Sequence, residues 1–342
     1  MIILGIETSC DETAAAVLKQ DENGIHILSN VIASSALLQA KYGGIIPEQA
    51  AREQIKSIIP VVTEALEMAQ VTSDKLDTIA VTYGPGLIGS LLVGVETAKT
   101  LAKVWHKPLI PVNHLIGHFY ANWIGNNPSF PCIGLLVSGG HTDLVLFENH
   151  GKYKYLGGTR DDAAGECFDK CARLLGLPYP GGPQLSKLAQ KGDPDKFKLP
   201  IPMKNSQDFD FSYSGLKTAV ANIVSRLQVT GNSKADLAAS IEGVIVKSLI
   251  KKVIKATATY QVNKVIVAGG VAANKKLCEE LKNNCQLSIV NCQLRFNRSQ
   301  LFIPPPNLCT DNAAMIAAAG FFQQSVKNPF KIQADPNLAL FS

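Results

Sequence analysis

The sequence predicts an α/β protein built from two related lobes. The chain has 342 residues, which is too long for a single core of typical size and suits two domains. A strand, a polar turn and a returning strand occur at the start and again near residue 132. Strand and helix patterns alternate after each of these openings. We expect one lobe over residues 1–125 and 322–342, and the other over 126–321.

The two openings have the same order of elements. Each begins with an apolar strand, continues through a turn rich in hydroxyl and carboxylate side chains, and returns in a second strand. No sequence identity links them, so we interpret them as a duplication of architecture. The elements are Ile2–Ile6, Glu7–Thr13 and Ala14–Leu18 in the first opening, and Cys132–Val137, Ser138–Asp143 and Leu144–Phe147 in the second.

Alternating strands and helices are expected to follow both openings. In the second half, a strand ends in a Gly-Gly turn before a further helix. Such a turn lets the backbone approach a ligand closely, and the start of the helix offers unpaired N–H groups. The expected elements are strand Leu76–Thr82, helix Gly89–Trp105, helix Lys234–Tyr260, strand Lys264–Ala268 and helix Ala313–Gln324.

Composition narrows the function classes. Hydrophobic residues make up 46% of the chain and charged residues 18%, as in globular proteins. The apolar runs are shorter than the roughly 20 residues of a membrane span, and Glu7 and Asp11 interrupt the apolar start where a signal peptide would continue. We therefore expect a cytoplasmic protein with reduced cysteines and no membrane contact. The net charge of +5 slightly favours a polyanionic partner.

Two histidines form the first candidate for chemistry. His114 and His118 are four residues apart in a predicted helix, so both imidazoles can reach one metal ion. The plain alternative is a pair of histidines packed or exposed at a helix end. A zinc protease would need HExxH, and Leu115 follows the first histidine here. A third, oxygen-bearing ligand would have to come from elsewhere in the chain.

Asp311 is the best candidate for that third ligand. It follows the proline-stiffened segment Pro304–Pro306 and is predicted to sit at the N-cap of the next helix. Its plain alternative is a helix cap with no other role. Two histidines and one carboxylate would leave metal positions open for a substrate, as in catalytic sites.

Glycine-rich turns are the second kind of candidate. Backbone amides in such turns suit phosphate or ribose binding, although each turn alone is a common structural feature. Asp161 and Asp162 lie near a helix start, where their negative charges interact favourably with the helix dipole. Asp169, one turn further in, is able to hydrogen-bond a sugar or an amide. The turns are Leu136–Gly140, Gly269–Asn274, Gly84–Gly86 and Gly181–Pro183.

Taken in order, these motifs resemble the tRNA N6-adenosine threonylcarbamoyltransferase family, formerly called O-sialoglycoprotein endopeptidase. The resemblance covers nearly the whole chain, and the joint match is highly specific. The matching stretches are GIETSCDETAAAV, GGIIPE, GPGLIGSLLVG, NHLIGH, LLVSGGHTDLVL, DDAAGECFDK, YPGGP, FSYSGLKTAV, VAGGVAAN and CTDNAAMIAAAG.

The resemblance implies a fold and a reaction. The fold is that of actin, Hsp70 and sugar kinases, with the active site in the cleft between two related lobes. The reaction moves a threonylcarbamoyl group from threonylcarbamoyl-AMP to N6 of adenosine 37 in tRNAs that read codons beginning with A. The residues that carry over as substrate-binding are Leu136, Val137, Ser138, Gly139, Gly140, Asp169, Gly182 and Asn274.

The resemblance also implies a cofactor and partners. One divalent metal ion per subunit is held by His114, His118 and Asp311, with Fe2+ favoured and Zn2+ as the alternative. Besides tRNA and threonylcarbamoyl-AMP, the expected partners are a smaller degenerate paralogue and a P-loop ATPase of the same pathway.

Asp11 and Glu12 are candidates for catalysis. We hypothesise that one of them assists deprotonation of the attacking amine; the alternative is that both carboxylates only shape the turn. The chain departs from the family pattern at two places. Gln54 stands where the family usually has a histidine, and the segment 275–310 is longer than usual.

Two other functions compete with the transferase. A metallo-endopeptidase is suggested by the paired histidines, but the activating glutamate of HExxH is missing. A nucleotide-driven switch or binding protein would need only the phosphate-binding turns, so the histidine pair argues against it.

Overall fold

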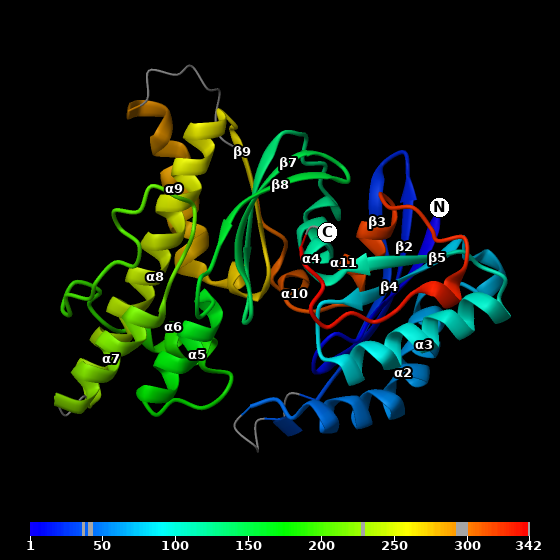
Figure 1. Ribbon diagram of the computed structural model, residues 1–342, viewed down its shortest axis with the longest axis horizontal. Helices are drawn as coiled ribbons and strands as arrows, with labels where there is room; N and C mark the ends of the chain where they lie inside the picture. The colour runs from blue at the N-terminus through cyan, green and yellow to red at the C-terminus, as the bar shows by residue number, and fades with distance from the viewer. Residues whose placement is uncertain (36–37, 40–43, 227–229, 292–299, 341–342) are drawn as a thin grey trace. The chain divides into compact units, whose positions relative to one another are not determined.

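The computed structural model describes residues 1–35, 38–39, 44–226, 230–291 and 300–340. The chain divides into two compact units: unit 1, formed by Met1–Asn127 with Pro306–Ser342, and unit 2, formed by Pro128–Pro305 (Figure 1). The prediction of two lobes is confirmed. The chain returns to unit 1 at Pro306, before the 322 expected from the sequence, because the helix that follows packs on the first strand of unit 1.

Unit 1 is a five-stranded mixed sheet in the order β3-β2-β1-β4-β5. β1, β2 and β3 are antiparallel neighbours, whereas β1, β4 and β5 run parallel. Helices α2 and α3 lie together below the sheet in Figure 1. The elements are β1 (Ile2–Glu7), β2 (Glu12–Asp21), β3 (Gly24–Ser34), α2 (Pro47–Ala69), η1 (Ser73–Lys75), β4 (Thr78–Gly84), α3 (Ile88–Val104), β5 (Leu109–Asn113), α4 (His114–Tyr120), η2 (Ala121–Trp123), α10 (Pro306–Cys309), α11 (Ala313–Gly320) and η4 (Pro329–Lys331).

Unit 2 repeats this topology. Its sheet has the order β10-β9-β6-β7-β8, in which β6 to β10 take the places of β1 to β5. The elements are β6 (Cys132–Val137), β7 (Thr142–Asn149), β8 (Lys152–Gly158), α5 (Ala164–Leu174), α6 (Gly181–Ala189), α7 (Ser214–Arg226), α8 (Gly231–Tyr260), β9 (Lys264–Ala268), η3 (Gly270–Ala273), α9 (Lys275–Asn291) and β10 (Gln300–Phe302).

The strand pairings confirm the predicted duplication. Glu7, at the end of β1, pairs with Ala14 of β2, and Val137, at the end of β6, pairs with Thr142 of β7. β1 pairs in parallel with β4, and β6 pairs in parallel with β9. Two sheets with the same strand order and the same mixture of directions are an architectural repeat, even though their sequences share no visible identity.

Strand β1 shows how the core of unit 1 positions a site. Because side chains alternate along a strand, Leu4 and Ile6 face the apolar core that α2 and α3 complete. Residues 3, 5 and 7 share the other face, against which α11 packs. A Cβ at Gly5 would lie 2.4 Å from the carbonyl oxygen of Ala313, so α11 approaches this strand more closely than any side chain would allow.

The predicted helix over Ala313–Gln324 is too long. The helix ends at Gly320, and Phe322 beyond it stacks on Tyr120 with ring centroids 5.2 Å apart. Glycine is the weakest helix former apart from proline, and this stacking draws the chain away from the helix axis. Among the described residues, no helix combines the length and apolar character needed to cross a bilayer.

Candidate functional site

Three parallel strands of unit 1 end at one edge of the sheet, and each delivers a polar side chain there. β1 ends at Glu7, β4 carries Thr82 two residues before its end, and β5 leads directly into His114. The strands are hydrogen-bonded neighbours in the order β1-β4-β5, so their carboxyl ends lie side by side. Ligands of α/β proteins bind at this edge of parallel sheets.

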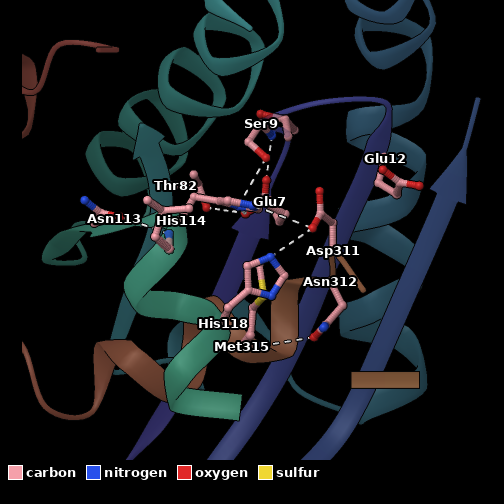
Figure 2. Close-up of polar contacts among 12 residues, drawn as sticks. Glu7, Ser9, Glu12, Thr82, Asn113, His114, His118, Asp311, Asn312 and Met315 are labelled. Atoms are coloured by element: carbon pink, nitrogen blue, oxygen red, sulfur yellow. Dashed lines mark hydrogen bonds and ion pairs between the residues drawn. The ribbon is translucent and has the colours of Figure 1, made fainter. Parts of the chain in front are cut away.

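The two predicted histidines lie on the short helix α4. The side chain of Asn113 caps this helix by accepting the backbone N–H of Leu115 at 2.9 Å. His114 and His118 follow at the first position and one turn later, with ring centroids 4.7 Å apart. Each imidazole presents Nε2 toward the same carboxylate (Figure 2).

That carboxylate belongs to Asp311, which precedes α11. Its Oδ1 lies 3.2 Å from Nε2 of His118 and 3.6 Å from Nε2 of His114. The prediction that Asp311 caps α11 is wrong. Asn312 is the cap and accepts the backbone N–H of Met315 at 3.0 Å, so the aspartate is directed to the histidines instead.

Glu7 completes the cluster, and sequence reasoning missed it. Its Oε2 lies 3.0 Å from Nδ1 of His114 and accepts the hydroxyl of Thr82 at 2.5 Å, while its Oε1 accepts the backbone N–H of Ser9 at 2.5 Å. The carboxylate is fully buried. The only signal in the sequence was an acidic residue at the last position of a buried strand.

Glu7 and His114 stabilise each other's charged forms. Burial alone would raise the pKa of the Glu7 carboxyl, but the charge and the hydrogen bond of His114 keep that pKa below its usual value. Burial likewise lowers the pKa of His114, but the charges of Glu7 and Asp311 together raise it to about 9. The pocket therefore favours a positive charge beside these carboxylates.

The residues present fit a divalent metal. One ligand atom from each of His114, His118 and Asp311 lies within 4.8 Å of the other two. Both ring nitrogens of His118 are buried and neither forms a hydrogen bond of good geometry among the described residues, although Nε2 lies 3.2 Å from Oδ1 of Asp311. Donor atoms around one first-row ion lie about 3–3.5 Å apart, given bond lengths of about 2.0–2.2 Å. The hydrogen bond from Nδ1 of His114 to Glu7 fixes Nε2 as the metal-facing nitrogen.

Asp11 and Glu12 lie in the turn after β1 and at the start of β2. Oε1 of Glu12 accepts the hydroxyl of Ser34 at 3.2 Å. Burial, a hydrogen bond with Asp11 and the negative charge of Asp311 raise the pKa of Glu12 to about 9. The raised pKa favours the protonated form of Glu12, which is able to donate a hydrogen bond.

Gln54 of α2 holds this turn in place. Its Nε2 donates to the backbone carbonyls of Cys10 at 2.9 Å and Glu12 at 3.0 Å, and the side chain is buried. Gln54, the residue at which the chain departs from the family pattern, therefore stabilises the turn that carries Asp11 and Glu12. It does so as a neutral amide, which does not titrate as a histidine would.

In unit 2 the glycine turns meet at the equivalent sheet edge. β6 and β9 are parallel neighbours, so the turn at Ser138–Gly140 and the turn at Gly269 lie side by side. Gly269 adopts φ of 89°, and a Cβ there would lie 2.4 Å from the carbonyl oxygen of Val137. Only glycine fits this crossing. Around Gly139 and Gly140 a Cβ would meet nothing within 4 Å, so their backbone is open to a ligand.

Helix α5 brings the other predicted residues of unit 2 toward these turns. The N–H of Gly165, in its first turn, donates to the carbonyl of Ser138 at 3.2 Å. Further along the helix, Oδ1 of Asp169 accepts the N–H of Gly182 at 2.8 Å. The structure therefore brings the predicted residues Asp169 and Gly182 into hydrogen-bond contact.

Asn274 follows η3, and its side chain joins three helices. Its Nδ2 donates to Oε1 of Glu242 in α8 at 2.7 Å and to the hydroxyl of Ser186 in α6 at 2.9 Å. Its Oδ1 accepts the N–H of Leu277 in α9 at 2.8 Å. Both amide hydrogens are engaged, so one lone pair of Oδ1 is left for a ligand. No pattern in the sequence pointed to Glu242 or Ser186.

Comparison with known proteins decides the family. The family model described as tRNA N6-adenosine threonylcarbamoyltransferase matches residues 26–318. Curated proteins of that name are similar over nearly the whole length. The protein from Symbiobacterium thermophilum is 49% identical over 99% of this chain and 97% of its own, and one from Listeria monocytogenes is 48% identical over 99% and 96%. The chain belongs to the tRNA N6-adenosine threonylcarbamoyltransferase family. This confirms the predicted family and the transferase class over the endopeptidase and the switch.

Solved structures of other proteins support the fold of this threonylcarbamoyltransferase family member. HypF of T. kodakarensis has a TM-score of 0.61 at 14% identity, covering 94% of this chain and 47% of its own. Component A of the Acidaminococcus fermentans (R)-2-hydroxyglutaryl-CoA dehydratase has a TM-score of 0.53 at 16% identity, covering 93% and 96%. At such identities the likeness concerns the fold alone. The predicted α/β fold with two lobes of the actin, Hsp70 and sugar-kinase type is confirmed.

Proposed function

We propose that this chain transfers the threonylcarbamoyl group from threonylcarbamoyl-AMP to N6 of adenosine 37 in tRNAs that read codons beginning with A, and that it does so in the cytoplasm. Near-full-length similarity to transferases of that name carries the proposal. The cluster of His114, His118 and Asp311 supports it, because a switch protein needs no such cluster.

The donor is a mixed anhydride and is already activated. The protein therefore has to hold it, orient it beside the amine and stabilise the charge that develops on the carbamoyl oxygen. In unit 2, the open backbone amides of Gly139 and Gly140 are placed to bind the phosphate of the AMP portion. Leu136 and Val137 end the strand that presents this turn, and Ser138 shapes it by accepting the N–H of His141 at 3.1 Å.

Asp169, Gly182 and Asn274 complete our assignment of the substrate-binding residues. The contact between Asp169 and the N–H of Gly182 places a carboxylate oxygen and a helix start at one point, which suits a ribose hydroxyl. The remaining lone pair of Oδ1 in Asn274 is able to accept a further donor. We assign all three residues to the nucleotide portion of the donor.

In unit 1, we assign a divalent metal to His114, His118 and Asp311. Fe2+ is favoured, because two histidines and one carboxylate with open positions are a typical Fe(II) ligand set, and Zn2+ is the alternative. When bound, the ion supplies Lewis acidity and orients the threonylcarbamoyl group. Elemental analysis of protein purified without oxygen would identify it, and an absence of both metals from active protein would contradict the assignment.

We assign the proton transfer from the attacking amine to the turn with Asp11 and Glu12. Glu12 is arranged as a hydrogen-bond donor, so Asp11 is the base and Glu12 orients it. Turnover of Asp11→Asn and Glu12→Gln, measured at equal metal occupancy, tests these roles. We expect the larger loss for Asp11→Asn, and wild-type turnover in both variants would remove the proposal.

The function is tested by reconstitution. Purified protein is incubated with tRNA, threonine, bicarbonate, ATP and the enzyme that makes the donor, and the nucleosides are then analysed by mass spectrometry. We expect threonylcarbamoyl-modified adenosine at position 37. A complete mixture that contains the partner proteins and yields no modified adenosine would contradict the proposal.

The partners we propose are a smaller degenerate paralogue and a P-loop ATPase. Helices α2 and α3 of unit 1 pack together and leave large apolar side chains exposed, which is typical of a protein–protein interface. We assign this face to the paralogue. The exposed apolar residues of this face are Ile55, Ile59, Ile88 and Leu92. Light scattering of the mixed proteins should show a complex that Ile55→Lys weakens and that Val104→Lys, an exposed position at the far end of α3, leaves intact.

A further inference from the structure

Charge is distributed unevenly between the two units. Residues 128–305 contain 23 of the 33 Lys and Arg residues but only 14 of the 28 Asp and Glu residues, which gives unit 2 a formal charge of +9. The rest of the chain has a formal charge of −4. The modest net charge of the whole chain hides this asymmetry. The net charge of unit 2 favours a polyanion, whereas that of unit 1 does not.

Four lysines of unit 2 gather where α8, the edge strand β8 and the segment 203–210 meet. Lys251 and Lys255, one turn apart on α8, donate to the carbonyls of Lys204 and Gln207, and so hold that segment against the helix. Lys154 projects from β8, the last strand of the sheet. We call Lys154, Lys204, Lys251, Lys255, Phe209 and Tyr260 the basic–aromatic patch.

Two aromatic rings organise the ammonium groups of the patch. Nζ of Lys154 lies 5.2 Å from the ring centroid of Tyr260, and Nζ of Lys255 lies 5.5 Å from that of Phe209. The centroids of Phe209 and Tyr260 are 6.0 Å apart. Cation–π contacts of this kind restrain lysine side chains that would otherwise be mobile.

The lysines of the patch form no salt bridge within the described part of the chain. No carboxylate there lies within salt-bridge distance of Lys154, Lys204, Lys251 or Lys255. Asp208 and Asp210 are in the same segment but pair with other cations, and Glu148 of β7, which is within electrostatic reach of Lys154, pairs with Lys152. Arg160 bridges both aspartates at 2.8 Å, and the buried Lys252 lies 3.2 Å from Asp208.

We propose that the basic–aromatic patch binds the sugar–phosphate backbone of the tRNA. This inference rests on the proposed function, which supplies the partner. Clustered lysines interleaved with aromatic rings are typical of nucleic-acid surfaces. Gly158, at the other end of β8, pairs with Asp143 beside the Ser138–Gly140 turn. Lys154 lies four residues before Gly158, about 13 Å along the strand, so one RNA molecule can cover both places.

The test is equilibrium binding of an unmodified tRNA transcript, measured by fluorescence anisotropy over a range of salt concentrations. The double variant Lys154→Gln with Lys251→Gln removes two charges and leaves a shorter, polar side chain at each position. The control, Lys75→Gln with Lys103→Gln, removes two exposed charges from unit 1 and so changes the net charge equally. A third protein, Lys154→Arg with Lys251→Arg, retains the charge.

We expect the plot of log affinity against log salt to flatten by roughly 0.7–0.9 for each lysine removed from the patch, and affinity at low salt to fall about tenfold or more. The control and the arginine variant should bind tRNA as the wild type does. Binding of a stable analogue of the adenylate donor should be equal in all four proteins.

A patch variant that binds tRNA with the wild-type affinity and salt slope would overturn the inference. If that variant instead loses a protein partner, the patch is a surface for an acidic protein, which also overturns it. Failure of the proposed function is a different result, because the wild-type protein would then neither bind nor modify the tRNA.

Discussion

Replacing Glu7 by glutamine should weaken metal binding although Glu7 is not a ligand. The carboxylate accepts hydrogen bonds on both oxygens, from Ser9 and Thr82 at 2.5 Å, and its Oε2 lies 3.0 Å from Nδ1 of His114. Glutamine has nearly the same shape, but one of its two terminal atoms is an NH2 group. Whichever way the amide turns, it therefore brings a donor against a donor.

Each orientation of the amide has a definite cost. With NH2 toward Ser9, two N–H groups oppose each other at a contact that is now 2.5 Å. With NH2 toward His114, the imidazole has to accept at Nδ1 and carry its proton at Nε2, the nitrogen that faces the metal. Loss of such an outer partner costs about 10- to 100-fold in metal affinity. Both orientations fail here and the negative charge is also lost, so we expect about 100-fold, or roughly 2.7 kcal/mol.

The assay is competition for Zn2+ between the metal-free protein and a chromophoric chelator. Glu12→Gln is the matched control: it is the same chemical change on a neighbouring carboxyl, whose Oε1 accepts the hydroxyl of Ser34, and it should shift the affinity less than twofold. Circular dichroism establishes that each variant is folded. A folded Glu7→Gln protein that binds Zn2+ within about twofold of the wild type would refute the reasoning.

Three further predictions follow from particular side chains. Gly269→Ala should lower the free energy of unfolding by about 2–3 kcal/mol or more in urea titrations, because φ of 89° strains alanine and its Cβ would strike Val137; a smaller loss would mean that the turn relaxes. Asn312→Ala should lower the free energy of unfolding by about 1 kcal/mol, because the helix cap is lost. It should also weaken Zn2+ binding because Asp311 precedes that cap, and an unchanged Zn2+ affinity would mean that the cap does not position Asp311. Burial raises the pKa of Asp143 to about 6 in the folded protein. The contribution of this carboxyl to the free energy of unfolding is therefore fully present below pH 3.8, its pKa in the unfolded chain, and is lost as the pH rises through 6. Asp143→Asn should therefore reduce the fall in unfolding free energy between pH 4 and pH 8 by about 2–3 kcal/mol, and identical pH profiles would contradict the shift.

The fold was largely predictable because its strands are buried and apolar. Cys132–Val137 and Lys264–Ala268 were predicted with the bounds that the structure has. β2 is longer than the predicted Ala14–Leu18, because pairing with β3 continues the strand through polar residues to Asp21. A hydrophobic pattern cannot show such an extension, since the polar end of the strand is held by backbone hydrogen bonds.

The residues of the candidate metal site were predictable in kind, and their supporting residues were not. The spacing of His114 and His118 on a helix places both imidazoles on one face, and the resemblance supplied Asp311. Glu7 was missed because its role depends on which face of β1 the residue occupies and on where β5 ends. The cap was assigned to Asp311 instead of Asn312 because adjacent Asp and Asn are equally good caps, and only the backbone conformation chooses between them.

The duplication explains how one architecture holds two kinds of chemistry. Glu7 and Val137 are the last residues of equivalent strands, and each pairs with the first returning strand of its own sheet. In unit 1 that position is a buried carboxylate, which needs cations and donors around it and has His114, Thr82 and Ser9. In unit 2 it is an apolar residue followed by an open glycine turn, which offers backbone amides to an anion. The sheets could stay alike because their geometry depends on buried apolar residues, whereas the residues just beyond the strand ends were able to diverge.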